Sequence, residues 1–228
     1  MRRPRGRPRG GRGAAGPPRR DALAADRDPP RGRRAPRAPA LRSPPRRLLR
    51  VVVTGPESTG KTTLARILAG RFDTTWAPEA ARGYLTCLGR PPSLPDIEAI
   101  ARLQLESEEA AARDARGLLV CDTDLLATRV WSEHYFGVCP GWVAEEAARR
   151  PYDLHLLCRA DVPWVDDGLR DSPGLGPRFE DAFRRALREA GRPFVERSGS
   201  WPEREDRAVA AILALGLPPL RQARPREG

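Results

Sequence analysis

A phosphate-binding pattern lies at residues 55–62 of the 228-residue chain. It reads Gly-Pro-Glu-Ser-Thr-Gly-Lys-Thr and matches G-x-x-x-x-G-K-[ST], between an apolar run and a helix-forming segment. The glycines let the backbone wrap closely around a phosphate, and the following helix presents free N–H groups to it. Lys61 is expected to neutralise the β- and γ-phosphates of ATP, and the Thr62 hydroxyl to bind Mg²⁺. The nucleotide-binding residues expected in this loop are Gly55, Pro56, Glu57, Ser58, Thr59, Gly60, Lys61, Thr62 and Thr63.

Lys61 is the only lysine among the 41 basic residues of the chain. Arginine supplies positive charge everywhere else, so lysine stands where a compact ammonium must reach between phosphates. Without a second lysine the chain cannot form the N-K-x-D element with which GTPases read guanine. Asp122 ends an apolar run and is followed by Thr123, where hydrolytic motor ATPases commonly have a glutamate that activates water. These features favour transfer of phosphate to an acceptor hydroxyl over hydrolysis.

Acidic side chains follow two of the apolar runs. Asp122 is positioned to hold Mg²⁺ directly or through water. Asp124 can reach the same metal or accept the proton of the acceptor hydroxyl, and its alternative role is to cap the next helix. Glu79 can bind ribose hydroxyls or serve as the base, and its alternative role is a surface ion pair with Arg82. We therefore predict Thr62 and Asp122 as metal ligands and leave the base open between Asp124 and Glu79.

These residues need a scaffold of alternating strands and helices. Strands are predicted at 48–54, 74–77, 117–121, 152–158 and 193–195. Helices are predicted at 62–71, 93–116 and 203–215, and a further helix runs through residues 131–136. The long helix opens with a Ser-x-x-Asp capping signal at Ser93. Such alternation implies a parallel sheet covered on both faces, with active residues at the carboxyl ends of its strands. The expected fold class is α/β, a three-layer α/β/α P-loop NTPase.

The formal net charge of +11 is concentrated at one end of the chain. The first fifty residues hold 17 arginines and three aspartates, which leaves residues 51–228 with a net charge of about −3. Residues 1–47 are rich in Pro, Gly and Arg and poor in large apolar side chains, so they are predicted to be a disordered tail. The tail is interpreted either as a basic arm for nucleic acid or as an inert extension. The lack of aromatic residues for base stacking favours the inert extension.

The remaining chain is predicted to be a P-loop kinase domain at 48–217 and a flexible C-terminal tail at 218–228. No segment has the apolar run of a signal peptide or the roughly 20 apolar residues of a membrane span. We therefore expect a cytoplasmic protein without membrane contact. The four cysteines are widely spaced and form no C-x-x-C pair, so neither a zinc site nor a disulfide framework is indicated.

Several segments together resemble the ribosylnicotinamide kinase domain of NadR-type proteins, a family of P-loop NTPases. They are residues 55–62, Trp76-Ala-Pro-Glu79-Ala-Ala-Arg82-Gly-Tyr84-Leu85, Asp122-Thr-Asp124 and Pro163-Trp164-Val-Asp-Asp167-Gly168-Leu-Arg170. Their order and spacing cover most of residues 50–215, and the last stretch is the most specific. The resemblance implies ATP-dependent transfer of the γ-phosphate to the ribose 5′-hydroxyl of ribosylnicotinamide, which gives nicotinamide mononucleotide.

A pocket for ribosylnicotinamide should combine an aromatic face with carboxylates, because its pyridinium ring is positively charged. Among the aromatic candidates, which include Trp131 and Tyr135, we favour Trp76 and Trp164 because they stand beside charged motif residues. The expected substrate-binding residues are Trp76, Glu79, Arg82, Tyr84, Asp124, Trp164 and Asp167.

Arg170 and Arg178 flank the Gly/Pro-rich stretch 171–176, which we interpret as a small lid over the bound nucleotide. Both arginines are expected to bind nucleotide, and Arg170 to stabilise charge on the transferring phosphoryl group. The alternative is a solvated loop with exposed arginines. The expected catalytic residues are Lys61, Asp124, Glu79 and Arg170.

Two other functions are kept as alternatives. One is a P-loop kinase for another nucleoside, a nucleotide or a sugar, and the other is a nucleotide-dependent regulatory module whose basic arm contacts nucleic acid. The oligomeric state is left open. No histidine precedes the P-loop, so the H-x-G-H-like element of an adenylyltransferase is missing and a stand-alone kinase is expected.

Overall fold

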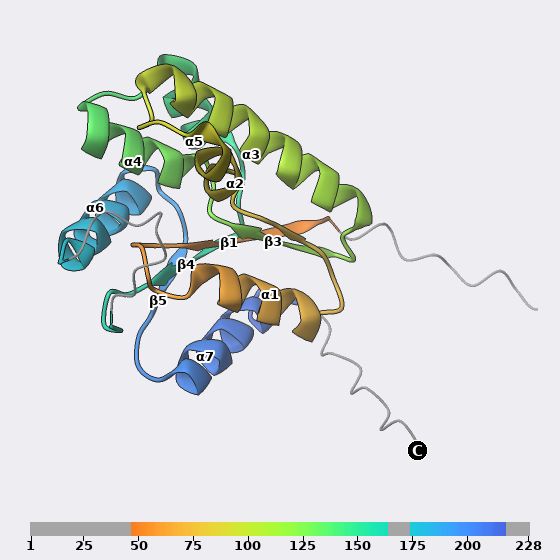
Figure 1. The fold of residues 1–228 in the computed structure, drawn as a ribbon. Helices are drawn as coiled ribbons and strands as arrows, with labels where there is room; N and C mark the ends of the chain where they lie inside the picture. Colours follow the sequence, from red (N-terminus) through yellow and green to blue (C-terminus); the bar gives the residue numbers. More distant parts are fainter. Residues whose placement is uncertain (1–46, 164–173, 218–228) are drawn as a thin grey trace, which may run out of the picture. The chain divides into compact units, whose positions relative to one another are not determined.

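Five parallel strands form the central sheet of this computed structural model, which describes residues 47–163 and 174–217 (Figure 1). The strands are β1 (Leu49–Thr54), β2 (Trp76–Ala77), β3 (Leu118–Asp122), β4 (Leu154–Cys158) and β5 (Phe194–Arg197), in the spatial order β2-β3-β1-β4-β5. The valines at 51–53 in central β1 are completely buried. This is the reason for the unbroken β-branched run, because a central parallel strand is covered on both faces.

Helices cover both faces of the sheet (Figure 1). They are α1 (Lys61–Arg71), α2 (Ala80–Leu88), α3 (Leu94–Asp114), α4 (Leu125–Phe136), α5 (Gly141–Arg149), α6 (Gly176–Glu189) and α7 (Trp201–Leu213). Helices α1 and α7 pack with Val51 and Val53 on one face of the sheet. The opposite face of β1 carries Val52, which packs with the end of α3, and Leu157 of β4 packs with α4 and α6. The predicted three-layer α/β/α fold is confirmed.

The carboxyl ends of β1 and β3 lie side by side in the sheet. The register pairs Val53 of β1 with Asp122 of β3 and with Leu156 of β4. The phosphate-binding loop leaves the end of β1, so Asp122 lies beside the start of that loop. The parallel sheet thus brings together two motifs that are about seventy residues apart in the sequence.

All five predicted strands and four predicted helices are present, but three helices were missed. Helix α2 has no fully buried residue, and its sequence was interpreted only as a run of motif residues. Helix α5 is nine residues long. Helix α6 begins at Gly176-Pro177, at the end of the stretch interpreted as the lid. Residues 1–46, 164–173 and 218–228 lie outside the described residues, so the tails and the domain boundaries remain predictions.

Two helices begin with the capping box, in which a serine and an acidic residue three positions later bond each other's backbone N–H. Ser93 and Asp96 cap α3, as the sequence predicts, and Ser200 and Glu203 cap α7. Among the described helices, none is at once long enough and apolar enough to cross a lipid bilayer.

Candidate active site

The phosphate-binding loop is packed closely against two neighbouring segments. Gly55 has φ +133°, and a Cβ atom there would lie 2.4 Å from the backbone oxygen of Cys158 at the end of β4. Gly60 has φ +78°, and a Cβ atom there would lie 2.5 Å from the indole ring of Trp201. Both positions therefore require glycine for conformation and for space. The two motif glycines let the loop fold back between β4 and the start of α7.

Hydrogen bonds within the loop fix its shape. The Thr59 hydroxyl donates to the Pro56 backbone oxygen over 2.8 Å, and the Lys61 ammonium donates to the same oxygen over 2.8 Å. Helix α1 begins at Lys61 with Gly60 as its N-cap, and no side chain caps it. Its first N–H groups are therefore available to an anion, and the helix dipole favours a negative charge at this end. The arrangement fits a polyphosphate.

Thr62 and Asp122 form the candidate metal site. The Thr62 hydroxyl donates to Asp122 Oδ2 over 2.6 Å, which joins the start of α1 to the end of β3. Burial raises the pKa of the Asp122 carboxyl to about 6, the nearby Glu79 raises it further, and the Thr62 hydrogen bond opposes both. Asp122 Oδ1 is buried and has no hydrogen-bond partner among the described residues. A hard cation that takes one or two protein oxygens, together with phosphates and water, fits this pair.

A cavity of about 370 Å³ opens in front of the loop. One side is formed by Glu57 to Thr63 of the loop, with the exception of Thr59. The opposite walls come from α2, α3 and α4 and from the segment between α2 and α3, and they include Glu79, Arg82, Arg90, Ile97, Trp131 and Tyr135. Glu79 and Arg82 lie at the start of α2, and the Arg82 Nε is 4.0 Å from the Glu79 Oε2. This is a phosphate-binding loop that faces a mixed polar and aromatic chamber large enough for a small acceptor.

The sequence model of a protein family described as an AAA domain matches residues 50–204. The chain belongs to this AAA-domain family. The matched range begins in β1 and ends in α7, so it includes the loop, the metal pair and the walls of the cavity.

Two curated proteins are similar to this AAA domain in sequence. The trifunctional NAD biosynthesis/regulator protein NadR of Escherichia coli is 33% identical over 151 residues, and that of Salmonella typhimurium is 31% identical over 151 residues. Each alignment covers 64% of this chain and 37% of the relative. The chain therefore matches little more than a third of the length of these curated relatives.

Solved structures show the same fold. A NadR protein in complex with NR superposes with a TM-score of 0.65 at 24% identity, covering 77% of this chain and 54% of that chain. A NadR protein in complex with NAD and AMP-PNP gives a TM-score of 0.62 at 23% identity, covering 77% and 52%. Thymidylate kinase from Ehrlichia chaffeensis gives 0.52 at 14% identity, covering 72% of this chain and 98% of that chain. The AAA domain thus has the fold of P-loop kinases.

Asp124 is directed away from the cavity by two interactions. Its Oδ1 accepts a hydrogen bond from the Ala127 backbone N–H over 3.0 Å, which caps α4, and its Oδ2 lies 3.0 Å from His155 Nε2. The side chains of Asp124 and His155 are both buried. Asp124 is not among the residues that line the cavity, although its neighbour Thr123 is. The geometry favours the capping alternative and corrects the expectation of a catalytic and substrate-binding role.

The aromatic residues of the cavity differ from those favoured by the sequence. Trp76 packs with the core on the α1 face of the sheet, and the Arg66 guanidinium lies 5.2 Å from its ring centre. Trp131 and Tyr135 of α4 line the cavity instead, with ring centres 5.9 Å apart and planes inclined by 19°. Trp131 also packs 4.1 Å from the ring of Phe179 in α6. Trp76 is therefore a core residue, and α4 supplies the aromatic wall.

Five further residues of the predicted site have different outcomes. Tyr84 does not line the cavity, because its hydroxyl donates to Asp96 over 2.6 Å. Arg178 is exposed in the first turn of α6 and does not line the cavity. Trp164, Asp167 and Arg170 lie outside the described residues, so their roles remain predictions.

Several cavity residues were missed from the sequence. Ile97 and Ile100 belong to the apolar face of α3, and nothing in the sequence distinguishes a cavity wall from a core contact. Phe136 at the end of α4 and Arg90 after α2 carried no motif. Only the packing of α2, α3 and α4 around one space identifies them.

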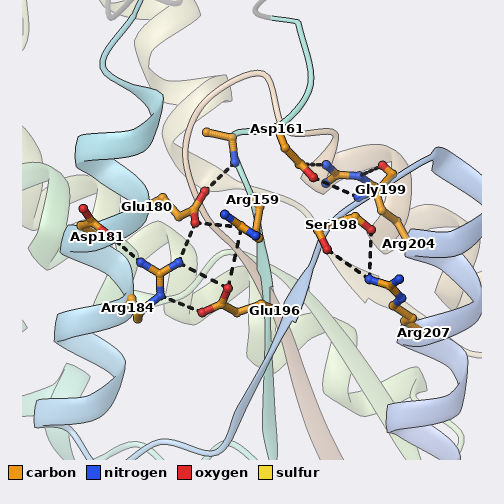
Figure 2. Close-up of polar contacts among 11 residues, drawn as sticks. Arg159, Asp161, Glu180, Asp181, Arg184, Glu196, Ser198, Gly199, Arg204 and Arg207 are labelled. Carbon is orange, nitrogen blue, oxygen red and sulfur yellow. Dashed lines mark hydrogen bonds and ion pairs between the residues drawn. The ribbon is translucent and has the colours of Figure 1, made fainter.

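The segment after β4, residues 159–161, is held by α6 on one side and by the turn before α7 and α7 itself on the other (Figure 2). Glu180 of α6 accepts hydrogen bonds from the Arg159 side chain and from the Ala160 backbone N–H, each over 2.9 Å. Asp161 accepts from the Gly199 backbone N–H over 2.9 Å and pairs with Arg204 of α7. The second set of contacts fixes the turn that carries Trp201 against the phosphate-binding loop. The loop thus rests on a turn that is itself tied to the end of β4.

Proposed function

We propose that this AAA domain is an ATP-dependent kinase that phosphorylates the ribose 5′-hydroxyl of ribosylnicotinamide. The observation that carries the proposal is one cavity shared by the phosphate-binding loop, the charged pair Glu79 and Arg82, and the aromatic wall of Trp131 and Tyr135. The names of the curated relatives, with NAD biosynthesis among their functions, and the NadR structure solved with NR support this acceptor.

The loop side of the cavity is suited to Mg-ATP. The free N–H groups at the start of α1 and the Lys61 ammonium would bind the phosphates, and Lys61 would leave the Pro56 oxygen to do so. Thr62 and Asp122 would hold Mg²⁺, which neutralises charge on the phosphate oxygens when it is bound. These residues would place the γ-phosphate next to the chamber.

The opposite walls are suited to a cationic nucleoside. The faces of Trp131 and Tyr135 attract a positively charged pyridinium ring, and the Glu79 carboxylate adds a complementary charge. In the reaction, the 5′-oxygen forms a bond to the γ-phosphorus, the bond to the bridging oxygen of ADP breaks, and the hydroxyl proton passes to a base. We assign this proton to Glu79, which is the carboxylate of the walls opposite the loop, because both oxygens of Asp124 are engaged and Glu57 lies on the loop side.

One observation favours a second acceptor class. Arg82 and Arg90 both line the cavity, in addition to Lys61. Such cations suit an acceptor that already carries a phosphate, as in a nucleoside monophosphate. Arg82 and Arg90 are already paired with Glu79 and Asp96, which is why ribosylnicotinamide is preferred.

The test is an acceptor panel assayed for ADP formation with Mg-ATP. The panel contains ribosylnicotinamide, thymidine, uridine, thymidine monophosphate, ribose and a sample without acceptor. We expect ADP release to depend on the acceptor and kcat/KM to be at least about tenfold higher for ribosylnicotinamide than for any other compound. A higher kcat/KM for thymidine monophosphate would establish the second class. ADP release at the same rate without acceptor would refute acceptor phosphorylation and favour a regulatory ATPase.

Glu79 and Asp124 can be separated by a pair of variants. Glu79→Gln is expected to lower kcat by about 10²- to 10³-fold with little change in the KM for ATP, because it removes the base from the cavity. Asp124→Ala is expected to keep kcat within a few-fold but to lower the free energy of unfolding by about 1–3 kcal/mol, because it removes a helix cap and leaves His155 without its partner. Steady-state kinetics and urea unfolding measure the two effects. The opposite pattern would assign the base to Asp124.

A further inference from the structure

Arg90 lines the cavity but has no role in the proposed reaction. It follows Gly89, the C-cap of α2, and its guanidinium meets Asp96 of α3 end-on. Arg90 Nη1 donates to Asp96 Oδ2 over 2.8 Å, and Nη2 donates to Asp96 Oδ1 over 2.9 Å. Nη1 also donates to the Pro91 backbone oxygen over 3.0 Å. Both hydrogens of Nη1 and one hydrogen of Nη2 are therefore in use.

Asp96 is a rigid anchor for this arginine. Its side chain is only 5% exposed, and it also accepts hydrogen bonds from Tyr84 over 2.6 Å and from the Ser93 hydroxyl and backbone N–H over 2.6 and 2.7 Å. The hydrogen bonds from Arg90, Ser93 and Tyr84 hold the pKa of the Asp96 carboxyl well below its usual range. Asp96 therefore stays ionised, and the capping box of α3 fixes its position.

One edge of the Arg90 guanidinium remains unused. In a guanidinium, the Nε–H and the outer N–H of Nη2 point in the same direction and form a second fork. Within residues 47–163 and 174–217, neither of these hydrogens has a hydrogen-bond partner. The Arg90 side chain is 52% exposed and lines the same cavity as the phosphate-binding loop and Trp131. Arg90 therefore keeps a preorganised pair of donors at a residue that borders the cavity.

We propose that Arg90 determines acceptor specificity by donating this free fork to the carbonyl oxygen of the acceptor's carboxamide. The inference rests on the proposed function, because it assumes that ribosylnicotinamide occupies the cavity. Asp96 balances the charge of Arg90, so the fork binds a neutral carbonyl and does not demand an anion. The same balance lets the site tolerate the positive pyridinium ring that α4 attracts. Arg90 thus recognises the carboxamide substituent of the pyridinium ring, and the aromatic wall of α4 recognises the positive charge of the ring.

The test compares two acceptors that differ only in the carboxamide. Ribosylnicotinamide carries it, and N-ribosylpyridinium lacks it but keeps the ring charge and the ribose. We expect the wild-type protein to prefer ribosylnicotinamide by about 10- to 100-fold in kcat/KM, the effect of a charge-assisted hydrogen-bond pair. In Arg90→Met this ratio is expected to fall to near one, mainly through a higher KM for ribosylnicotinamide, with the KM for ATP unchanged.

Two further variants keep the test decisive. Arg90→Lys retains a cation for Asp96 without a planar fork, so it supports the fold and is still expected to lose most of the preference. Arg102→Met is the matched control, because Arg102 lies on α3 with its guanidinium 4.6 Å from the Trp142 ring centre and does not line the cavity. Its preference is expected to equal that of the wild-type protein.

The inference and the proposed function fail in different ways. If the Arg90 variants lose activity equally with both acceptors, Arg90 only supports the structure and the inference is overturned. The same holds if the wild-type protein does not distinguish the two acceptors. If the wild-type protein phosphorylates neither acceptor, the proposed function is refuted and the inference falls with it.

Discussion

Lys61→Ala is expected to lower kcat for phosphoryl transfer by about 10³-fold or more while the domain remains folded. Lys61 is the only lysine of the chain, and no other residue of the loop places a positive charge at the start of α1. The loop keeps its shape without it, because Gly55 and Gly60 set the backbone and Thr59 bonds the Pro56 oxygen. Single-turnover phosphoryl transfer and a thermal unfolding curve measure the two parts of the prediction.

Two variants define what the Lys61 result means. Lys61→Arg keeps the charge but replaces a compact ammonium by a planar group, so it is also expected to lose most activity. Arg66→Ala removes a cation from the same helix at a site that contacts Trp76 and does not line the cavity, so its turnover should stay close to normal. Near-normal turnover of Lys61→Ala would show that the loop is not the catalytic phosphate site.

The phosphate site could be predicted from the sequence because its chemistry is local. Gly55, Gly60 and Lys61 belong to one short motif, although Cys158 and Trp201 also pack against it, and the apolar patterns on either side indicate the flanking strand and helix. Asp122 could also be predicted from the sequence. It ends a buried strand, and neighbouring parallel strands end at the same edge of the sheet, so Asp122 lies beside the phosphate-binding loop. The sequence motif and the strand topology therefore place the phosphate site at the same position.

The acceptor side could not be predicted in the same way, because it depends on contacts between distant segments. Trp76 stands three residues before Glu79, but strand alternation directs its ring to the α1 face and away from the cavity. Asp124 is held by His155, which comes from a strand 31 positions further along the chain. Trp131 and Tyr135 reach the cavity because α4 faces α2 and α3 across it. The spacing of residues along the sequence does not show which distant segments come into contact.

Asp122→Asn is expected to remove most activity and at the same time to stabilise the folded domain. The carboxylate is expected to hold Mg²⁺ together with Thr62, and an amide oxygen is a much weaker ligand for this cation. We expect kcat/KM for Mg-ATP to fall by about 10²-fold or more, with a higher Mg²⁺ requirement. Kinetics at varied Mg²⁺ concentration measure this part. Thr62→Val, which removes the partner hydroxyl, should shift the Mg²⁺ requirement in the same direction.

The stability gain follows from the pKa of Asp122. Burial and Glu79 raise this pKa from 3.8 to about 6, so the folded state binds a proton more tightly than the unfolded state. The free energy of unfolding therefore falls as the pH rises through the interval from about 4 to 6. Above this interval, the ionised Asp122 carboxylate lowers the free energy of unfolding by on the order of 2–3 kcal/mol. The neutral amide avoids this cost. Urea unfolding without nucleotide should show Asp122→Asn to be more stable than the wild-type protein at pH 8, with most of the difference gone at pH 4.

The proposed metal site gives this cost of burying Asp122 a functional reason. A buried carboxylate with one oxygen unpartnered is unfavourable in the free domain and becomes favourable when a cation arrives. Mg-ATP should therefore raise the unfolding temperature of the wild-type protein much more than that of Asp122→Asn. If the variant were less stable than the wild-type protein at pH 8, or gained as much from Mg-ATP, Asp122 would be a structural residue that pairs with Thr62 and not a metal ligand.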